Sequence, residues 1–342
     1  MALIALKIDV DTLRGTREGV AALVTMLQQE KANATFLFSL GPDHTGWAMR
    51  RVFRPGFLKK VSRTSVVEHY GIKTLLYGTL LPGPDIGRRA AQEMRAVRDA
   101  GFEVGIHTWD HVYWQDNVRG RDAAWTEKQM QQAHARFIEI FGHAPATHGA
   151  AGWQTNEHAL RLIDQWGMTY ASDGRGVGPY YPIVDGRTLQ QVQMPTTLPT
   201  LDELIGVGDI TTANVADAVL ALTAKTEAKT EAKTEANSQA SPARTSASTS
   251  TDSPARTSAE IAAGKPSQHQ TGSDHIFTLH AELEGQKLAP VFRQLLQGWR
   301  RQGHQLVSMA EYYAALDTSA LPAYPFVWGE IPGRSGELMV QP

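Results

Sequence analysis

The sequence contains no cysteine and no long apolar run, and its charges nearly cancel. Without cysteine, disulfide bonds and thiolate ligands are excluded, so a bound metal must use histidine and carboxylate side chains. No stretch approaches the roughly 18 consecutive apolar residues that a transmembrane helix needs. The net charge of −2 gives no general attraction to nucleic acid, and we expect no nucleic-acid partner.

The signatures of three large enzyme classes are also missing from the sequence. It has no G-x-S-x-G elbow, no P-loop and no G-x-G-x-x-G that opens a helix after a strand. Serine hydrolases, nucleotide hydrolases and dinucleotide enzymes therefore lose support. The glycine-rich stretch at 174–178 lacks a following helix and indicates a loop beside a site.

What the sequence does have is a regular alternation of strand-like and helix-like segments. Apolar runs predict strands at 3–10, 33–40, 102–107, 145–150, 168–172, 191–195 and 276–280, and amphipathic stretches predict helices at 17–31, 87–100, 126–141, 156–166 and 288–302. Such alternation implies parallel strands and an α/β fold. Ionisable residues recur at the downstream strand ends, which favours a (β/α) barrel of about seven strands over an open sheet.

Two short motifs at strand ends indicate a metal site. Asp9 and Asp11 flank Val10 and point to the same side of an extended chain, so one can ligate a metal while the other stays free. His107 and His111 share a face if the chain turns helically after the strand. Two histidines and one carboxylate leave a position open for water, and a second carboxylate can take the proton of that water.

The segment from Trp47 to Pro84 is rich in basic and aromatic residues and has only one acid before Asp85. The cations that we select as candidates for lipid contact are Arg50, Arg51, Arg54, Lys59, Lys60 and Arg63. Such a mixture suits the surface of an anionic membrane. A lid that packs on the barrel, or a site for a substrate phosphate, would use the same residues.

A second segment departs from the alternation between about residues 223 and 273. It begins with Lys-Thr-Glu-Ala repeats and continues as a Ser/Thr/Pro/Ala tract. In a helix the repeats would align like charges four residues apart. We therefore predict a disordered insertion.

Several motifs together resemble those of the polysaccharide deacetylase (NodB-homology) family. In order along the chain they are Asp9-Val10-Asp11, Ala34-Thr35-Phe36, His107-Thr108-Trp109-Asp110-His111 and Leu279-His280. Further stretches are similar to the branch of that family that deformylates an undecaprenyl-phosphate-linked formamido-arabinose; they are 8–19, 151–153, 172–176, 198–200 and 280–285. The similarity covers nearly the whole chain outside 223–273.

The resemblance implies a distorted (β/α) barrel and a role for each site residue. Asp11, His107 and His111 would hold one divalent ion. The family commonly uses zinc, and cobalt, manganese or nickel are alternatives. Asp9 would be the general base and His280 the acid that protonates the departing amine. The product sugar would be destined for lipid A, where its charge weakens binding of polymyxin and other cationic peptides.

One departure from the family pattern concerns the third motif. The family supplies there an arginine that orients the base, whereas residues 147–153 contain none. Arg175 could take over this duty from the next strand end. His148, Trp153 and Asp173 are further candidates for binding or orienting the substrate, although simple hydrogen bonding in a loop would also explain His148.

These observations lead to expectations about organisation and setting. We expect a catalytic barrel at 1–222 and 274–318, which contains the 47–84 insertion, and a carboxyl-terminal extension at 319–342. Because the first residues predict a core strand and no secretory leader, we expect a cytoplasmic enzyme at the inner face of the membrane. A deacetylase of chitin or peptidoglycan, or a non-catalytic sugar or lipid binder, remains an alternative.

Overall fold

A curled parallel sheet forms the centre of the molecule. The computed structural model describes residues 2–48, 71–224, 274–334 and 336–342. The strands of the sheet are β1 (Leu3–Val10), β2 (Thr35–Ser39), β3 (Glu103–Thr108), β4 (Thr147–His148), β5 (Tyr170–Ala171), β8 (Val192–Gln193), β9 (His275–His280) and β10 (Gln305–Val307). Every pairing within it is parallel, as the alternation of strands and helices predicts.

The order of the strands makes an incomplete barrel. From β1 the sheet continues through β2, β3, β4 and β5 to β8, while β9 pairs with the other side of β1. Near the open side, the backbone N–H groups of Thr197 and Leu198, just after β8, both donate to the carbonyl of Ile276 on β9. The predicted distorted barrel is confirmed, and β10 is a strand that the sequence patterns did not reveal.

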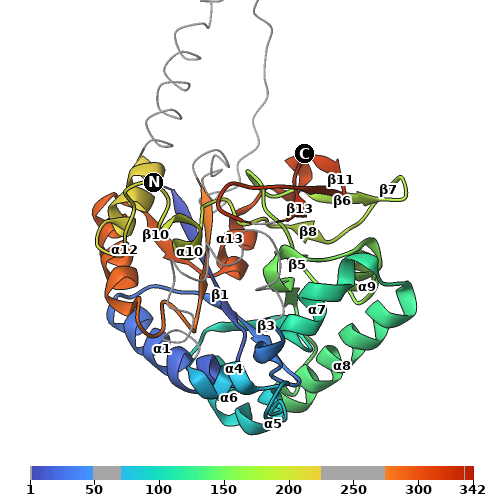
Figure 1. Ribbon diagram of the computed structural model, residues 1–342. Coiled ribbons are helices and arrows are strands. Elements are labelled where there is room, and N and C mark those ends of the chain that lie inside the picture. The colour runs from blue at the N-terminus through green and yellow to red at the C-terminus, as the bar shows by residue number, and fades with distance from the viewer. Residues whose placement is uncertain (1, 49–70, 225–273, 335) are drawn as a thin grey trace, which may run out of the picture.

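Helices cover the outside of this sheet (Figure 1). The covering elements include η1 (Gly15–Gly19), α1 (Val20–Gln29), α5 (Ile86–Arg89), α6 (Ala91–Asp99), α8 (Ala123–Phe141), α9 (Glu157–Gln165), α12 (Ala289–Arg301) and α13 (Met309–Ala315). Further helical elements are α4 (Ile72–Leu76), α7 (His111–Asn117), η3 (Val118–Gly120), η4 (Ala151–Trp153), α10 (Leu201–Leu204) and η5 (Thr318–Ala320), and residues 215–224 are also helical. All five predicted helices are present within a few residues.

Strand β1 shows how the two faces of the sheet are used. All eight of its residues are buried, as expected for a parallel strand with both faces covered. Ile4, Leu6, Ile8 and Val10 join the large core beneath the helices. The alternate residues, among them Lys7 and Asp9, therefore face the interior of the barrel.

Local signals fix the ends of α8, the longest helix among the described residues. The Asp122 carboxylate accepts the backbone N–H of Trp125 at the start of α8, which satisfies a group that the helix itself leaves unpaired. Gly142 ends the same helix in the left-handed conformation, with φ of 79°.

Two small sheets lie at the end of the molecule that carries the carboxyl terminus (Figure 1). They consist of β6 (Tyr181–Val184), β7 (Arg187–Thr188) and β11 (Ala323–Pro325) in one sheet, and β12 (Val327–Gly329) and β13 (Leu338–Val340) in the other. The backbone of Arg175 donates to Met339 and accepts from Gln341. The last residues of the sequence are thus attached to the loop that follows β5.

Two sequence expectations fall outside the described residues. The cations from Arg50 to Arg63 lie in 49–70, and nearly all of the insertion expected at 223–273 lies in 225–273. In the part of the chain that is described, no helix has the length and apolar character needed to cross a bilayer.

Candidate metal centre

Four predicted site residues lie at the carboxyl-terminal ends of neighbouring strands. Asp9 is the penultimate residue of β1, and Asp11 follows that strand directly. His107 lies near the end of β3, and His111 is the first residue of α7. Because β1, β2 and β3 run parallel in this order, their ends meet at one edge of the sheet.

Asp11, His107 and His111 form a compact cluster whose ligand atoms all lie within 4.8 Å of one another. Asp11 Oδ1 is 3.3 Å from Nε2 of His107 and 3.4 Å from Nε2 of His111. Burial alone would raise the pKa of Asp11, but the positive charges of His111 and His107 hold it far below its ordinary value. The two histidines that the spacing suggests and the aspartate that the family resemblance selects therefore lie together in the fold.

The orientation of each imidazole has a visible cause. His107 donates from Nδ1 to the Gly149 carbonyl at 2.6 Å, which leaves Nε2 to face Asp11. Asp110 caps α7 by accepting the backbone N–H of Tyr113, and so fixes the turn on which His111 stands.

This donor set suits a divalent cation. Asp11 Oδ1 is buried and makes no hydrogen bond within the described part of the chain, although two imidazole nitrogens face it. A buried carboxylate oxygen without a hydrogen-bond donor is costly, and a metal ion would relieve that cost. Two histidines and one carboxylate also leave coordination positions open for water, as hydrolytic metal sites require.

Asp9 lies beside this cluster and is held by a lysine. Lys7 Nζ donates to Asp9 Oδ2 at 2.7 Å, and both side chains are buried. The other oxygen, Oδ1, is 3.8 Å from His107 Nδ1 and has no hydrogen-bond partner among the described residues. The two carboxylates thus differ: Asp11 faces both histidines, whereas Asp9 is paired with a cation and keeps one oxygen available.

His280 lies opposite Asp9. The two residues are register partners in the β1–β9 pair, and the His280 backbone N–H donates to Glu284 Oε2 at 2.8 Å. His280 Nδ1 is buried and makes no hydrogen bond to any described residue. An imidazole in this position can give a proton to a group bound at the carboxyl-terminal ends of β1 and β9.

Sequence reasoning assigned no role to two residues that shape this site, Lys7 and Glu282. Glu282 Oε1 accepts the backbone N–H groups of Asp11 and Thr12, at 3.1 and 2.8 Å, and so fixes the turn that carries Asp11. Burial and the nearby charge of Asp11 raise the pKa of Glu282 well above its ordinary value. Lys7 does carry a sequence signal: it is the single cation in an otherwise largely apolar strand, two residues before Asp9.

The remaining candidates are not members of the Asp11, His107 and His111 cluster. The Arg175 guanidinium binds both carboxylate oxygens of Glu203, at 2.7 and 2.9 Å, and the cation that contacts Asp9 is Lys7. Arg175 also lies over the ring of Trp153, with Cζ 4.8 Å from the ring centroid. The structure therefore does not place Arg175 on the base, where we expected a replacement for the missing arginine.

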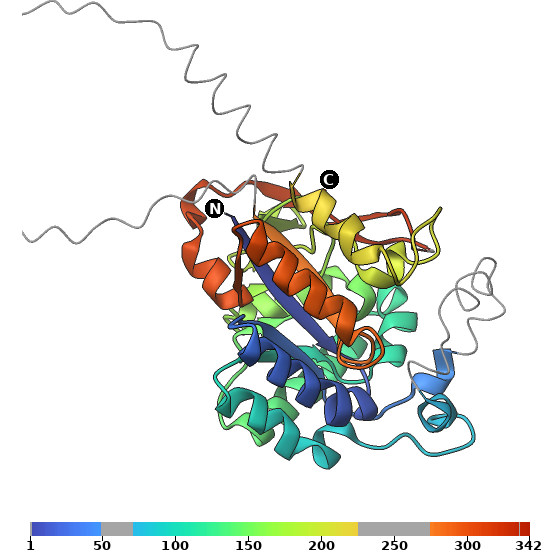
Figure 2. The ribbon, with the colours of Figure 1, turned by 90° about the vertical axis from the view of Figure 1, so that its left-hand side faces the viewer.

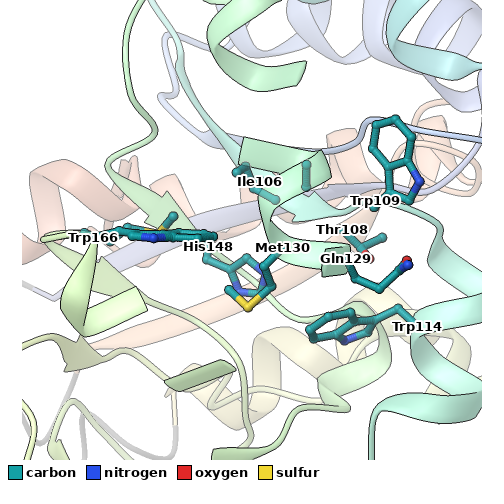
Figure 3. Close-up of a pocket in the computed structure, with 10 residues that line it drawn as sticks. Ile106, Thr108, Trp109, Trp114, Gln129, Met130, His148 and Trp166 are labelled. Carbon is teal, nitrogen blue, oxygen red and sulfur yellow. The ribbon is translucent and has the colours of Figure 1, made fainter. Parts of the chain in front are cut away.

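His148 and Asp173 form a buried pair of their own. His148 donates from Nδ1 to Asp173 Oδ1 at 2.7 Å, and the backbone N–H of Ala150 donates to the same oxygen. His148 also lines an interior pocket with Ile106, Trp114, Met130 and Trp166 (Figure 3). The lining of this pocket includes no member of the metal cluster. We therefore assign the candidate hydrolytic site to the metal cluster and not to this pocket.

Comparison with known proteins agrees with this geometry. A family profile described as "Polysaccharide deacetylase" matches residues 3–171. The probable 4-deoxy-4-formamido-L-arabinose-phosphoundecaprenol deformylase ArnD of Shewanella sediminis is 36% identical over 64% of this chain and 70% of its own length. A protein of the same description from Wigglesworthia glossinidia brevipalpis is 25% identical over 96% of this chain and 98% of its own length.

Solved structures show the same fold. A Mycobacterium smegmatis protein assigned as a polysaccharide deacetylase superposes with a TM-score of 0.57 at 15% identity, covering 96% of this chain and 95% of that one. A probable polysaccharide deacetylase of Pseudomonas aeruginosa gives 0.51 at 13% identity, with 92% and 91% covered. With the Asp/His/His cluster at the expected strand ends, these similarities lead to one conclusion: the chain belongs to the polysaccharide deacetylase family.

Proposed function

We propose that this protein is a metal-dependent hydrolase that removes the formyl group of 4-deoxy-4-formamido-L-arabinose-phosphoundecaprenol. Water adds across the amide, and the products are formate and the lipid-linked 4-amino-4-deoxy-L-arabinose. The observation that carries the proposal is the Asp11, His107 and His111 cluster with the free oxygen of Asp9 beside it. The deformylase description of the two relatives supplies the substrate.

The residues divide the work of hydrolysis between them. Asp11, His107 and His111 would hold the ion, and such an ion lowers the pKa of water and polarises a carbonyl. Asp9 Oδ1, free of hydrogen bonds to the described chain, accepts the proton of the attacking water. Lys7 on Asp9 Oδ2 keeps that carboxylate in place. His280, across the β1–β9 pair, delivers a proton to the departing amine nitrogen.

A membrane-bound substrate requires that the enzyme reach the bilayer surface. The segment around α4 projects from the body of the molecule (Figure 2). In this segment 68% of the Ile72 surface and 80% of the Leu80 surface are exposed to solvent. This segment directly follows the cationic stretch of the sequence. We propose peripheral binding to the inner face of the membrane, with the product used for lipid A modification and resistance to polymyxin and other cationic peptides.

The direct test measures formate release from the formylated lipid by zinc-loaded protein. Asp9→Asn is expected to lower the rate roughly 100-fold or more while zinc stays bound, because it removes the proton acceptor but no ligand. His107→Ala is expected to lose both zinc and activity. Asp99→Asn, a change on the exposed end of α6, serves as the control and keeps full activity.

Undiminished formate release by both site variants would refute the proposal. The same assay with the N-acetylated lipid separates a deformylase from a general deacetylase. We expect hydrolysis of the formyl compound and little of the acetyl compound; equal rates on both would shift the assignment to an N-acyl hydrolase of broader range.

A further inference from the structure

Arg334 approaches the site from the segment between β12 and β13. Its guanidinium carbon is 4.2 Å from the centroid of the Trp153 ring, and Nε donates to Glu203 Oε1 at 2.9 Å. The side chain is 14% exposed. Among the residues that the structure describes, no partner is found for its two terminal nitrogens. These two donors are available to a ligand.

Arg334 shares its acidic partner with Arg175. Glu203 Oε1 accepts from both guanidinium groups, so two mostly buried cations lie against one carboxylate. Asp202 is the other acid whose charge reaches Arg175, and its carboxylate accepts the Thr200 hydroxyl. Burying a second guanidinium whose two terminal nitrogens have no partner among the described residues costs desolvation free energy, unless an anion binds to it.

The Trp153 ring connects this pair to the reaction centre. Lys7, which holds Asp9, places Nζ 5.6 Å from the centroid of the same ring. The ring is fixed, because Trp153 is buried and its Nε1 donates to the Thr196 hydroxyl. Arg334 and the lysine that holds the base therefore lie near the same indole ring.

We propose that Arg334, supported by Arg175, binds the phosphodiester that links the substrate sugar to its lipid. This inference rests on the proposed function, in which the phosphate and the formamide lie on opposite sides of one sugar ring. The two terminal nitrogens of a planar guanidinium can donate parallel hydrogen bonds to two oxygens of one phosphate. The competing explanation is that Arg334 only fastens the carboxyl-terminal segment to Glu203.

Two soluble substrates distinguish these explanations. One is the formamido-arabinose joined through a phosphodiester to geraniol, and the other is the neutral geranyl glycoside of the same sugar. Arg334→Met is expected to lower kcat/KM for the phosphodiester roughly 10- to 100-fold, mainly through KM, because charge-assisted hydrogen bonds are lost. The neutral glycoside is expected to react within twofold of the wild-type rate. An equal loss on both substrates would overturn the proposal.

Arg119 offers a matched control. It also stacks on a tryptophan, Trp328, and pairs with a glutamate, Glu337, but among the described residues no contact joins it to Trp153 or Lys7. Arg119→Met is expected to loosen the same carboxyl-terminal segment without changing the preference for the phosphodiester. If Arg119→Met abolishes that preference as strongly as Arg334→Met does, the role of Arg334 is only to fasten the segment.

A binding measurement keeps this inference separate from the deformylase assignment. Titration calorimetry with geranyl methyl phosphate, a diester without sugar or formyl group, needs no turnover. We expect Arg334→Met to weaken its binding at least tenfold and Arg119→Met to leave it unchanged. Equal binding by wild type and Arg334→Met would overturn the phosphodiester site even if formate is released. Loss of binding in the variant would support the site even if no formamide is hydrolysed.

Discussion

At the scale of single residues, the least expected feature is a lysine buried in the first strand. Lys7 is fully buried and its ammonium group meets Asp9 at 2.7 Å. The candidate metal cluster could be predicted because two aspartates and two histidines fall at strand ends in the sequence, and the family resemblance selects Asp11 rather than Asp9 as the ligand. Lys7 could not be recognised in the same way, because one lysine in an apolar run is also compatible with a strand end, and only the fold shows its partner.

The Lys7–Asp9 pair makes a prediction about stability and activity together. Lys7→Met leaves the Asp9 charge buried without its partner, and we expect a loss of about 3–5 kcal/mol in unfolding free energy. Lys7→Met combined with Asp9→Asn removes both charges and is expected to regain most of that loss. Urea unfolding of the two single variants and the double variant measures the coupling directly.

Measurements of activity test the Lys7–Asp9 pair independently of stability. Lys7→Arg retains the cation and is expected to keep more deformylase activity than Lys7→Met, since only the position of Asp9 would change. Equal rates for these two variants, or simple additivity of the unfolding free energies, would show that Lys7 does not position the base.

At the scale of elements, the turn after β9 shows what sequence patterns capture and what they miss. The strand itself was predicted because its residues form an apolar run. The buried carboxylates of Glu282 and Glu284 in the turn were quoted as part of a family resemblance, yet their roles depend on contacts with Thr12 and with the His280 backbone. The short strands β6, β7, β11 and β12 were missed because they are exposed or only partly buried and no apolar run marks them, whereas the equally short β4, β5 and β8 are buried within apolar runs. The short strand β13 was also missed.

Glu284 gives this turn a dependence on pH. Burial raises the pKa of Glu284 to about 7 in the folded protein, against 4.5 for an ordinary glutamate. Between these values the unfolded chain has lost a proton that the folded chain keeps, so stability must fall as pH rises through this window and level off above it. The loss is on the order of 3 kcal/mol at most.

The Glu284→Gln variant tests whether stability falls as the pH rises. The variant has no proton to lose, so its stability relative to wild type is expected to increase between pH 4.5 and 7 and then to stay constant. Urea unfolding at pH 5 and pH 8, with a chelator present in both, measures the difference. A relative stability that does not change with pH would show that Glu284 is already ionised in the fold.

At the scale of the whole molecule, the metal cluster joins parts of the chain that lie far apart in sequence. Asp11 follows β1, whereas His107 and His111 belong to β3 and α7, so an ion bound to all three closes a long loop. The fold class was predictable because alternating strands and helices leave few arrangements. The attachment of the carboxyl-terminal segment at Arg175 and Trp153 was not, because no local pattern marks such a contact.

Zinc is therefore expected to stabilise the folded protein as well as activate it. A ligand that binds only the folded state at 100 times its dissociation constant contributes about 2.7 kcal/mol. We expect this gain in urea unfolding of wild type relative to chelator-treated protein, and no gain in His111→Ala. A similar gain in that variant would mean that zinc binds elsewhere.

The alternation along β1 has one more consequence. Lys7, Asp9 and Asp11 occupy every second position of a single extended stretch, and three neighbouring strands pair with it at defined positions. Deleting or inserting one residue ahead of Lys7 would require the strand either to slip or to bulge. If it slipped by one position, Leu6, Ile8 and Val10 would face the reaction centre and all three charges would face the helices. In a redesign of this enzyme, a point substitution in β1 changes one side chain and its role. A slip caused by a change in the length of β1 would instead turn all its polar side chains toward the helices and its apolar ones toward the reaction centre.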